Sequence, residues 1–167
     1  MDFNKDFEIK TATSNDSSTI INILKQIAQW LKDSGINQWR YLLDGGDDDE
    51  IAQAIKNQET YIVLKDKEIV ATFTLLSKQS EWDEHIWGSD ASLESLYLHR
   101  LAIIPTYMKK GLGKDILTWI KDNVSDKEYL KLDCVADNMK LNSFYKNNGF
   151  ELIGVTDEHS KYQMSIK

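Results

Sequence analysis

Two glycines and three lysines stand together in the segment Lys109-Lys110-Gly111-Leu112-Gly113-Lys114, directly after an apolar run. The backbone N–H groups that open a helix have no partner inside it, and glycine lets another molecule approach them closely. Such a turn binds anions, and the lysines add positive charge in a chain whose formal net charge is −7. The segment therefore predicts a ligand that carries phosphate.

Two common phosphate-binding motifs do not fit this turn. A Walker A loop needs Gly where Met108 stands and Ser or Thr where Asp115 stands. The dinucleotide fingerprint needs a third Gly or Ala at the position of Ile116. The remaining reading is a diphosphate held by main-chain amides, although Gly111 and Gly113 alone would equally suit a tight junction between loop and helix.

Polar and aromatic residues also gather downstream of the glycine turn. Asn138 follows an apolar run and is a good helix N-cap, Tyr145 lies on the helix that follows, and Gly149 ends that helix. A helical tyrosine is more often a packing residue than a catalyst. Cys134 lies inside the apolar run with no histidine beside it, so we expect a buried, unreactive thiol.

The spacing of apolar residues predicts the elements that position these groups. Strands are expected at 7–10, 61–64, 69–75, 96–104, 129–135, 150–155 and 162–166. Helices are expected from the Thr13-x-x-Asp16 capping box to Gly35, and at 47–55, 111–124 and 139–148, with a polar loop at 79–92. A tight turn joins the early strands and helices join later ones, which predicts a mixed α/β sheet with a parallel pair at 96–104 and 129–135.

Composition narrows the class of protein. A chain of 167 residues suits one domain, 1–167, with a substantial core. Twenty basic and 27 acidic residues disfavour nucleic-acid and anionic membrane partners, and no apolar run is long enough to span a bilayer. A polar N-terminus and a single cysteine favour the cytoplasm, and no cluster with metal-ligand spacing is visible.

Taken together, the two segments resemble the GNAT superfamily of acetyl-CoA-dependent N-acetyltransferases. The residues that carry the resemblance are Leu101-Ala102-Ile103, Gly111-x-Gly113, Asn138, Phe144-Tyr145 and Gly149-Phe150. The order of elements extends it over residues 7–166. It implies a single-domain α/β fold with a mixed, mostly antiparallel sheet of about seven strands, helices on both faces and a splayed parallel strand pair that holds the cofactor.

The resemblance also implies roles for individual residues. The main chain of Leu101, Ala102 and Ile103 would bond the pantetheine arm of acetyl-CoA, which Asn138 would also contact. The diphosphate would lie against the residues of the turn, which are Met108, Lys109, Lys110, Gly111, Leu112, Gly113 and Lys114. The family usually has Gln or Arg where Met108 stands, and main-chain contacts would tolerate the change. Tyr145 would lie at the cofactor and act as the general acid that protonates the departing thiolate, since a phenol is protonated at neutral pH.

The general base and the acceptor are less determined. His99 and Glu94, on and before the predicted cofactor strand, are the base candidates, and His85 and Glu84 are weaker ones. Each has a structural alternative. The acceptor would be a primary amine of a small molecule or peptide, with Trp39 as a substrate contact. The wider acceptor lining would come from Arg40, Tyr41, Trp82, Trp87, Glu81, Asp83 and Glu84.

The expected function is transfer of the acetyl group from acetyl-CoA to this amine in a ternary complex. The alternative is a GNAT-like module that senses acyl-CoA without turnover, suggested by Met108 and the undetermined base. Transfer of a longer acyl group is a third reading. A homodimer is compatible with all three, and a metal ion is not expected.

Overall fold

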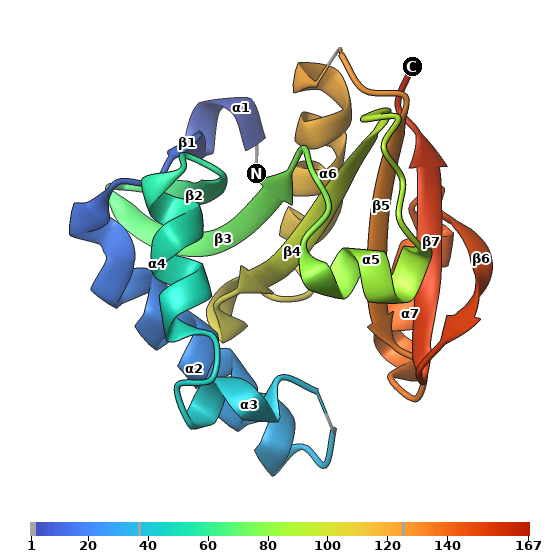
Figure 1. Ribbon diagram of the computed structural model, residues 1–167. Coiled ribbons are helices and arrows are strands. Elements are labelled where there is room, and N and C mark those ends of the chain that lie inside the picture. The colour runs from blue at the N-terminus through green and yellow to red at the C-terminus, as the bar shows by residue number, and fades with distance from the viewer. Residues whose placement is uncertain (1–2, 37, 125) are drawn as a thin grey trace. The chain divides into compact units, whose positions relative to one another are not determined.

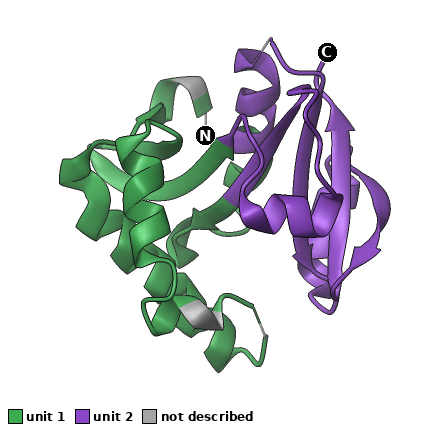
Figure 2. Ribbon diagram, viewed as in Figure 1, with its two compact units in different colours: residues 1–75, 100–115 green, residues 76–99, 116–167 purple. Residues whose placement is uncertain are grey.

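The computed structural model describes residues 3–36, 38–124 and 126–167, and of Asn4, Arg40 and Tyr41 only the backbone. The polar start at Met1 and Asp2, and the side chains of Arg40 and Tyr41 expected near the acceptor, lie outside the described part. The chain packs as two compact units, coloured separately in Figure 2. The first unit is residues 1–75 and 100–115, and the second is residues 76–99 and 116–167.

The described residues form a seven-stranded mixed sheet (Figure 1). Its strands are β1 (Glu8–Thr11), β2 (Thr60–Lys65), β3 (Glu68–Leu76), β4 (Ser95–Ile103), β5 (Tyr129–Val135), β6 (Glu151–Thr156) and β7 (His159–Ser165). Their hydrogen-bonded order is β1-β2-β3-β4-β5-β7-β6. The β4–β5 pair is parallel, whereas β1–β2, β2–β3, β5–β7 and β7–β6 are antiparallel. The predicted α/β sheet, with its parallel pair, is confirmed.

The helices connect these strands. They are α1 (Phe3–Asp6), α2 (Ser17–Asp33), α3 (Arg40–Leu43), α4 (Asp48–Lys56), α5 (Glu81–Trp87), α6 (Leu112–Asn123) and α7 (Met139–Asn147), with 3₁₀ turns η1 (Ser14–Asp16) and η2 (Pro105–Tyr107). In the described part of the chain, none has both the length and the apolar composition that crossing a bilayer requires.

The core of the first unit is built around α2. Its apolar stripe, predicted from the spacing, is buried: Ile20, Ile23, Leu24, Ile27, Ala28 and Leu31. The Thr13 N–H donates to Asp16 Oδ2 at 2.8 Å, which closes the predicted capping box ahead of the helix. The stripe packs with Ile51 and Ile55 of α4, Ile62 of β2 and Ala102 of β4. Because Ala102 is part of this core, the end of β4 is held firmly in the first unit.

In the second unit, alternate residues of β5 face opposite sides of the sheet. Leu130, Leu132 and Cys134 are buried, whereas Lys131 and Asp133 are only half-buried. Tyr145 of α7 packs against Tyr162, the β7 partner of Leu132, with ring centroids 5.8 Å apart. Trp82 of α5 instead contacts Asp133. Helices therefore cover both faces of this unit, and Figure 1 shows α5 in front of the strands and α7 behind them.

The prediction of a loop over residues 79–92 is wrong, because this segment contains α5. The Asp83 N–H donates to Ser80 Oγ at 3.1 Å, and the Ser80 N–H donates to Asp83 Oδ2 at 3.0 Å. These two bonds form a capping box that opens a helix of seven residues. Such a short helix spans about two turns, too few to display a period of 3.6. The four-residue helices α1 and α3 also have no counterpart in the prediction.

Candidate active site

The parallel strands β4 and β5 stop pairing before they end. Their register runs from Ser95↔Tyr129 to Tyr97↔Lys131, yet β5 continues to Val135. His99 and Asp133 follow these last paired positions by two residues, within the second unit. Where a parallel pair diverges, main-chain groups no longer bond the neighbouring strand and become available to an extended ligand. This divergence has the form that the resemblance predicts for the pantetheine site.

Within the first unit, β4 has an unusual backbone conformation at Arg100. Its φ is 50°, in the left-handed region that non-glycine residues rarely adopt. Arg100 Nη1 lies 3.7 Å from Asp47 Oδ2, which helps to hold this conformation. Such conformations persist only where the surrounding structure holds them, and they are common at functional sites. The half-buried Leu101 and Ile103 lie on either side of the buried Ala102, just after Arg100.

The glycine turn follows η2 and opens α6. Gly111 has φ 80° and Lys109 has φ 65°, and a Cβ placed on Gly111 would meet no protein atom within 4 Å. The Asp115 N–H donates to the Gly111 carbonyl at 3.1 Å, so the helix begins at Leu112. The N–H groups of residues 112–114 therefore lie in the first turn, where α-helices offer no internal acceptor. This turn has the geometry of an anion site.

Positive charge surrounds the turn. Lys109, Lys110 and Lys114 are exposed, and the Lys110 ammonium lies 5.4 Å from the centre of the Tyr107 ring. Lys65 of β2 lies 5.9 Å from the same ring and adds a cation that the sequence analysis missed, because it is far away in the chain. Together these side chains favour a ligand that carries several negative charges.

Met108 has a packing role in the first unit. Its side chain is half-buried against the core around α2, together with Ile104 and Trp39. Its N–H donates to the Pro105 carbonyl at 3.2 Å. The departure from the family pattern therefore places an apolar side chain in the core and leaves the backbone of the turn unobstructed.

In the second unit, Tyr145 is 6% exposed and its ring packs against Phe144, Phe150 and Tyr162. Burial raises the pKa of Tyr145 well above its ordinary value, and the nearby Cys134 and Asp133 act in the same direction. The phenol is thus protonated over the whole physiological range. A buried, protonated phenol is a proton donor.

Asn138 caps α7, as predicted. Its Oδ1 accepts the Leu141 N–H at 3.1 Å. The sequence analysis missed the neighbouring Asn142, whose Nδ2 donates to the Asn138 carbonyl at 2.8 Å and whose Oδ1 accepts the Tyr162 hydroxyl at 2.6 Å. This network holds the turn between β5 and α7, which contains Asn138 and precedes the helix that carries Tyr145.

His99 is paired with a carboxylate that the sequence analysis placed only in the acceptor lining. The imidazole Nε2 lies 2.9 Å from Asp83 Oδ1 and 3.0 Å from Oδ2. The Asp83 side chain is 1% exposed and the His99 side chain 15% exposed. Nothing in the sequence joins these residues, because they are 16 positions apart on a helix and a strand.

A second carboxylate lies on the same face of this unit. The Trp82 Nε1–H donates to Asp133 at 3.0 and 3.2 Å, one distance to each oxygen. Burial raises the pKa of Asp133, while the Trp82 bond and the charges of His99 and His159 act against that rise. An ammonium ion brought to Asp133 would supply a positive charge that neutral Trp82 lacks.

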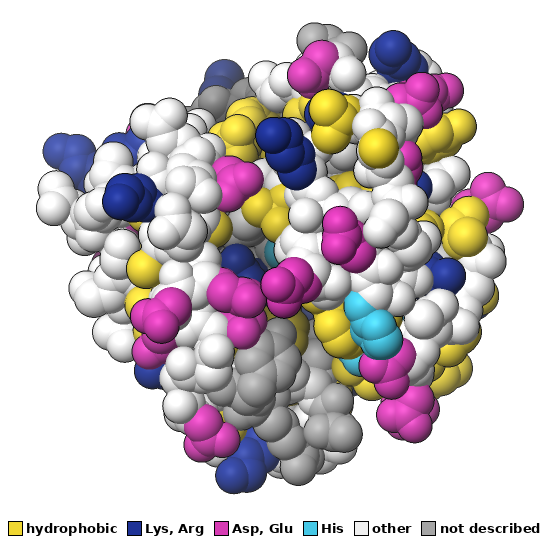
Figure 3. All heavy atoms as spheres, viewed as in Figure 1, with side chains coloured by type: hydrophobic (Ala, Val, Ile, Leu, Met, Phe, Trp, Pro, Cys, Tyr) yellow, Lys and Arg dark blue, Asp and Glu magenta, His cyan; other side chains and the backbone are white. Residues whose placement is uncertain are grey.

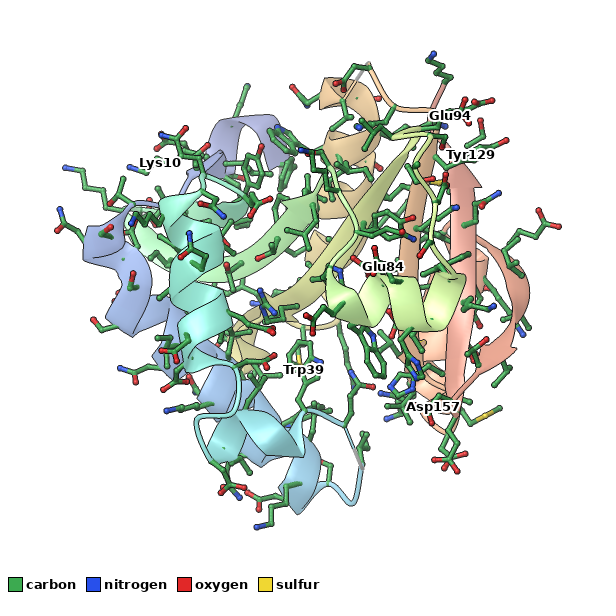
Figure 4. All side chains as sticks on the ribbon, in the orientation of Figure 1. Lys10, Trp39, Glu84, Glu94, Tyr129 and Asp157 are labelled. Carbon is green, nitrogen blue, oxygen red and sulfur yellow. The ribbon has the colours of Figure 1, made fainter. Side chains whose placement is uncertain are left out.

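The remaining candidates are placed differently. Glu94 is exposed and precedes β4, beside Tyr129 at the end of the unit away from Asp157 (Figure 4). His85 bonds Asp157 at 3.0 Å with 55% of its side chain exposed, and Figure 3 shows a histidine against acidic side chains in this area. Glu84 is also exposed. Trp39, with φ 63°, packs against the core of the first unit.

A metal centre finds no support in residues 3–36, 38–124 and 126–167. Among them, no three His, Cys, Asp or Glu side chains come together in a way that could hold an ion.

The chain is similar to known proteins over most of its length. A family model described as the acetyltransferase (GNAT) family matches residues 24–150. The chain belongs to the GNAT acetyltransferase family. The matched range contains parts of both units and every residue that the resemblance rests on.

Individual relatives agree with the GNAT assignment. An uncharacterized N-acetyltransferase of Bacillus subtilis, YesJ, is 40% identical over 145 residues, which are 86% of this chain and 81% of that protein. A GNAT acetyltransferase of Listeria monocytogenes superimposes with a TM-score of 0.81 at 26% identity, over 95% of this chain and 94% of its own. The PaiA N-acetyltransferase of Thermoplasma acidophilum, solved with coenzyme A, gives 0.76 at 16% identity over 95% and 98% of the two chains. The last likeness shows the GNAT fold alone.

Proposed function

We propose that this GNAT protein transfers the acetyl group of acetyl-CoA to a primary amine of a small molecule or peptide. The observation that carries the proposal is the early end of the β4–β5 pairing, which frees main-chain groups at the strand that resembles the family's cofactor strand. The open turn at Gly111 supports it. That the PaiA relative was solved with coenzyme A is consistent with the same ligand here.

The cofactor contacts follow from the two units taken separately. In the first, the main chain of Leu101, Ala102 and Ile103 would bond the pantetheine amides. One of these N–H groups would polarise the acetyl carbonyl as an oxyanion donor. The turn from Lys109 to Lys114 would hold the diphosphate. In the second unit, Asn138 would contact the pantetheine arm.

His99 and Tyr145 would handle the protons. His99 takes one proton from the acceptor ammonium, directly or through water, which leaves a neutral amine with a lone pair. The amine nitrogen attacks the acetyl carbon, a C–N bond forms and the C–S bond breaks. Tyr145 gives its proton to the departing thiolate, and the new amide nitrogen loses its remaining extra proton. The sum is an ammonium ion and acetyl-CoA giving an amide, CoA-SH and one proton.

We prefer His99 to Glu94 as the base. His99 lies just past the last paired residues of β4 and β5, whereas Glu94 precedes β4 at its other end. His85 and Glu84 are more exposed than His99. The acceptor would approach the face of the second unit that carries Asp133, so a cationic amine fits best. Trp39 is the weakest of the substrate assignments, because its indole packs on a core.

We further propose that residues 1–167 act as one catalytic domain, in the cytoplasm. The test is titration of the purified protein with acetyl-CoA, followed by measurement of thiol release across a panel of amines. Saturable binding with turnover on at least one amine supports the transferase. Binding without turnover on any amine supports the sensor, and absence of binding overturns both. Replacing acetyl-CoA with longer acyl-CoAs in the same assay decides the acyl chain length.

A further inference from the structure

We propose that Asp83 is the positioning residue for His99, and that it leaves Nδ1 of His99 as the nitrogen that accepts the proton of the acceptor amine. This inference rests on the proposed function. It specifies which nitrogen of His99 acts as the base and which buried carboxylate orients the imidazole.

The geometry determines which nitrogen of His99 carries hydrogen. Both oxygens of Asp83 face Nε2, at 2.9 and 3.0 Å. A carboxylate only accepts hydrogen bonds, so Nε2 must be the donor. A neutral imidazole has one N–H and one lone pair, and the lone pair is therefore on Nδ1.

Asp83 is itself held in place. Its Oδ2 accepts the Ser80 N–H at 3.0 Å, and its own N–H donates to Ser80 Oγ at 3.1 Å. Its side chain is 1% exposed. A carboxylate fixed by its backbone cannot turn away from the imidazole, so His99 keeps one tautomer and one orientation. This is how a buried Asp orients a catalytic His in hydrolase triads.

Carboxylates on two elements interact with His99. Asp83 faces it from α5, and Asp133 interacts with it electrostatically from β5. Asp133 in turn interacts with His159 of β7. A positive charge that forms on His99 as it takes a proton is therefore met by carboxylates on two elements. The charge of Asp133 would also attract a cationic amine to this face of the unit.

Another pair in the same unit provides a matched control. His85 Nε2 lies 3.0 Å from Asp157 Oδ2, the same atom types at the same distance as the pair of His99 and Asp83. Their side chains are 55% and 58% exposed. Asp157→Asn thus makes the same chemical change in an exposed pair.

The first test is kinetic. An amide in place of the Asp83 carboxylate can present its NH₂ to Nε2, which moves the hydrogen to Nδ1 and removes the acceptor. We expect Asp83→Asn to lower kcat by about 10²- to 10⁴-fold, the usual contribution of a general base, with little change in the KM for acetyl-CoA. Asp157→Asn should keep the wild-type kcat. Wild-type kcat in Asp83→Asn overturns the proposal, as does an equal loss in Asp157→Asn.

The second test needs no turnover. Long-range ¹H–¹⁵N spectra of protein labelled in its three histidines, with His99→Gln for assignment, report which nitrogen carries hydrogen. We expect hydrogen on Nε2 of His99 in the wild type and on Nδ1 in Asp83→Asn. Hydrogen on Nδ1 in the wild type overturns the inference, and this spectrum suffices if Asp83→Asn does not fold. If the wild type acetylates no amine, the proposed function fails, while the spectra still decide the role of Asp83.

Discussion

Trp82 of α5 holds the carboxylate of Asp133 through its indole N–H, which donates to both oxygens at 3.0 and 3.2 Å. The two residues are 51 positions apart, and the contact joins helix α5 to strand β5. It places a partly buried acid beside the His99 pair with a neutral donor as its hydrogen-bond partner.

Asp133 should make the stability of the protein depend on pH. Burial raises the pKa of Asp133, so the folded protein keeps this proton to a higher pH than the unfolded chain does. The free energy of unfolding should therefore fall as the pH rises from about 4 through the pKa of folded Asp133. Asp133→Asn should flatten this slope and be the more stable protein near pH 7, as measured by urea unfolding at several pH values. The control Asp122→Asn, on the exposed side of α6, should keep the slope.

Tyr145→Phe should separate chemistry from binding. The phenylalanine ring keeps the contacts with Phe144, Phe150 and Tyr162, so the fold should be retained. Loss of the hydroxyl should lower kcat by about 10²-fold or more, because the thiolate then leaves without its proton donor. Acetyl-CoA affinity should stay within a few-fold of the wild type. Tyr129→Phe, at the first residue of β5, makes the same chemical change elsewhere in the unit and is the control. An unchanged rate in Tyr145→Phe would contradict the role of Tyr145 as the acid.

The high pKa of Tyr145 also makes a prediction about pH. Because burial keeps the phenol protonated, Tyr145 should cause no loss of activity at pH values up to about 10, the ordinary value for tyrosine. Any decline of kcat in the wild type below that pH should persist in Tyr145→Phe. A decline that disappears in the variant would show that Tyr145 titrates earlier than its burial allows.

Gly111→Val should abolish saturable binding of acetyl-CoA. The side chain would occupy space that the protein leaves open beside the N–H groups of the turn. At φ 80° any L-residue is also strained, at a cost of about 1 to 3 kcal/mol. Gly35→Val separates the two effects, because Gly35 has φ 77°, equally open surroundings and a place at the end of α2. Isothermal titration should show binding lost in the first variant and kept in the second.

The Cys134 thiol should resist alkylation in the folded protein. Burial raises the pKa of Cys134 to about 12, with a further contribution from the charge of Asp133, so the reactive thiolate is scarce. Iodoacetamide at pH 8 should leave the native protein unmodified by mass spectrometry and should modify it fully in urea. Rapid labelling of the native protein would show that β5 opens or that the thiol is more accessible than its 5% exposure indicates.

Much of the fold follows from local patterns. The stripe of α2, the capping boxes at Thr13 and Ser80, and the strand periods depend on residues within a few positions of one another. The first of these capping boxes was predicted, whereas the one at Ser80 was passed over because the helix behind it has seven residues. The role of Met108 in the core was equally invisible, since α2 lies far upstream in the chain.

The sequence by itself determined the family, the order of the strands and of the longer helices α2, α4, α6 and α7, and the residues that resemble a cofactor site, because each depends on spacing along the chain. Only the tertiary structure decided that His99 meets Asp83, that Trp82 meets Asp133, and that Arg100 has a positive φ within β4. Those relationships arise where a helix packs on a strand or where a strand is distorted. The spacing of residues along the chain does not show which residues 16 or 51 positions apart come into contact.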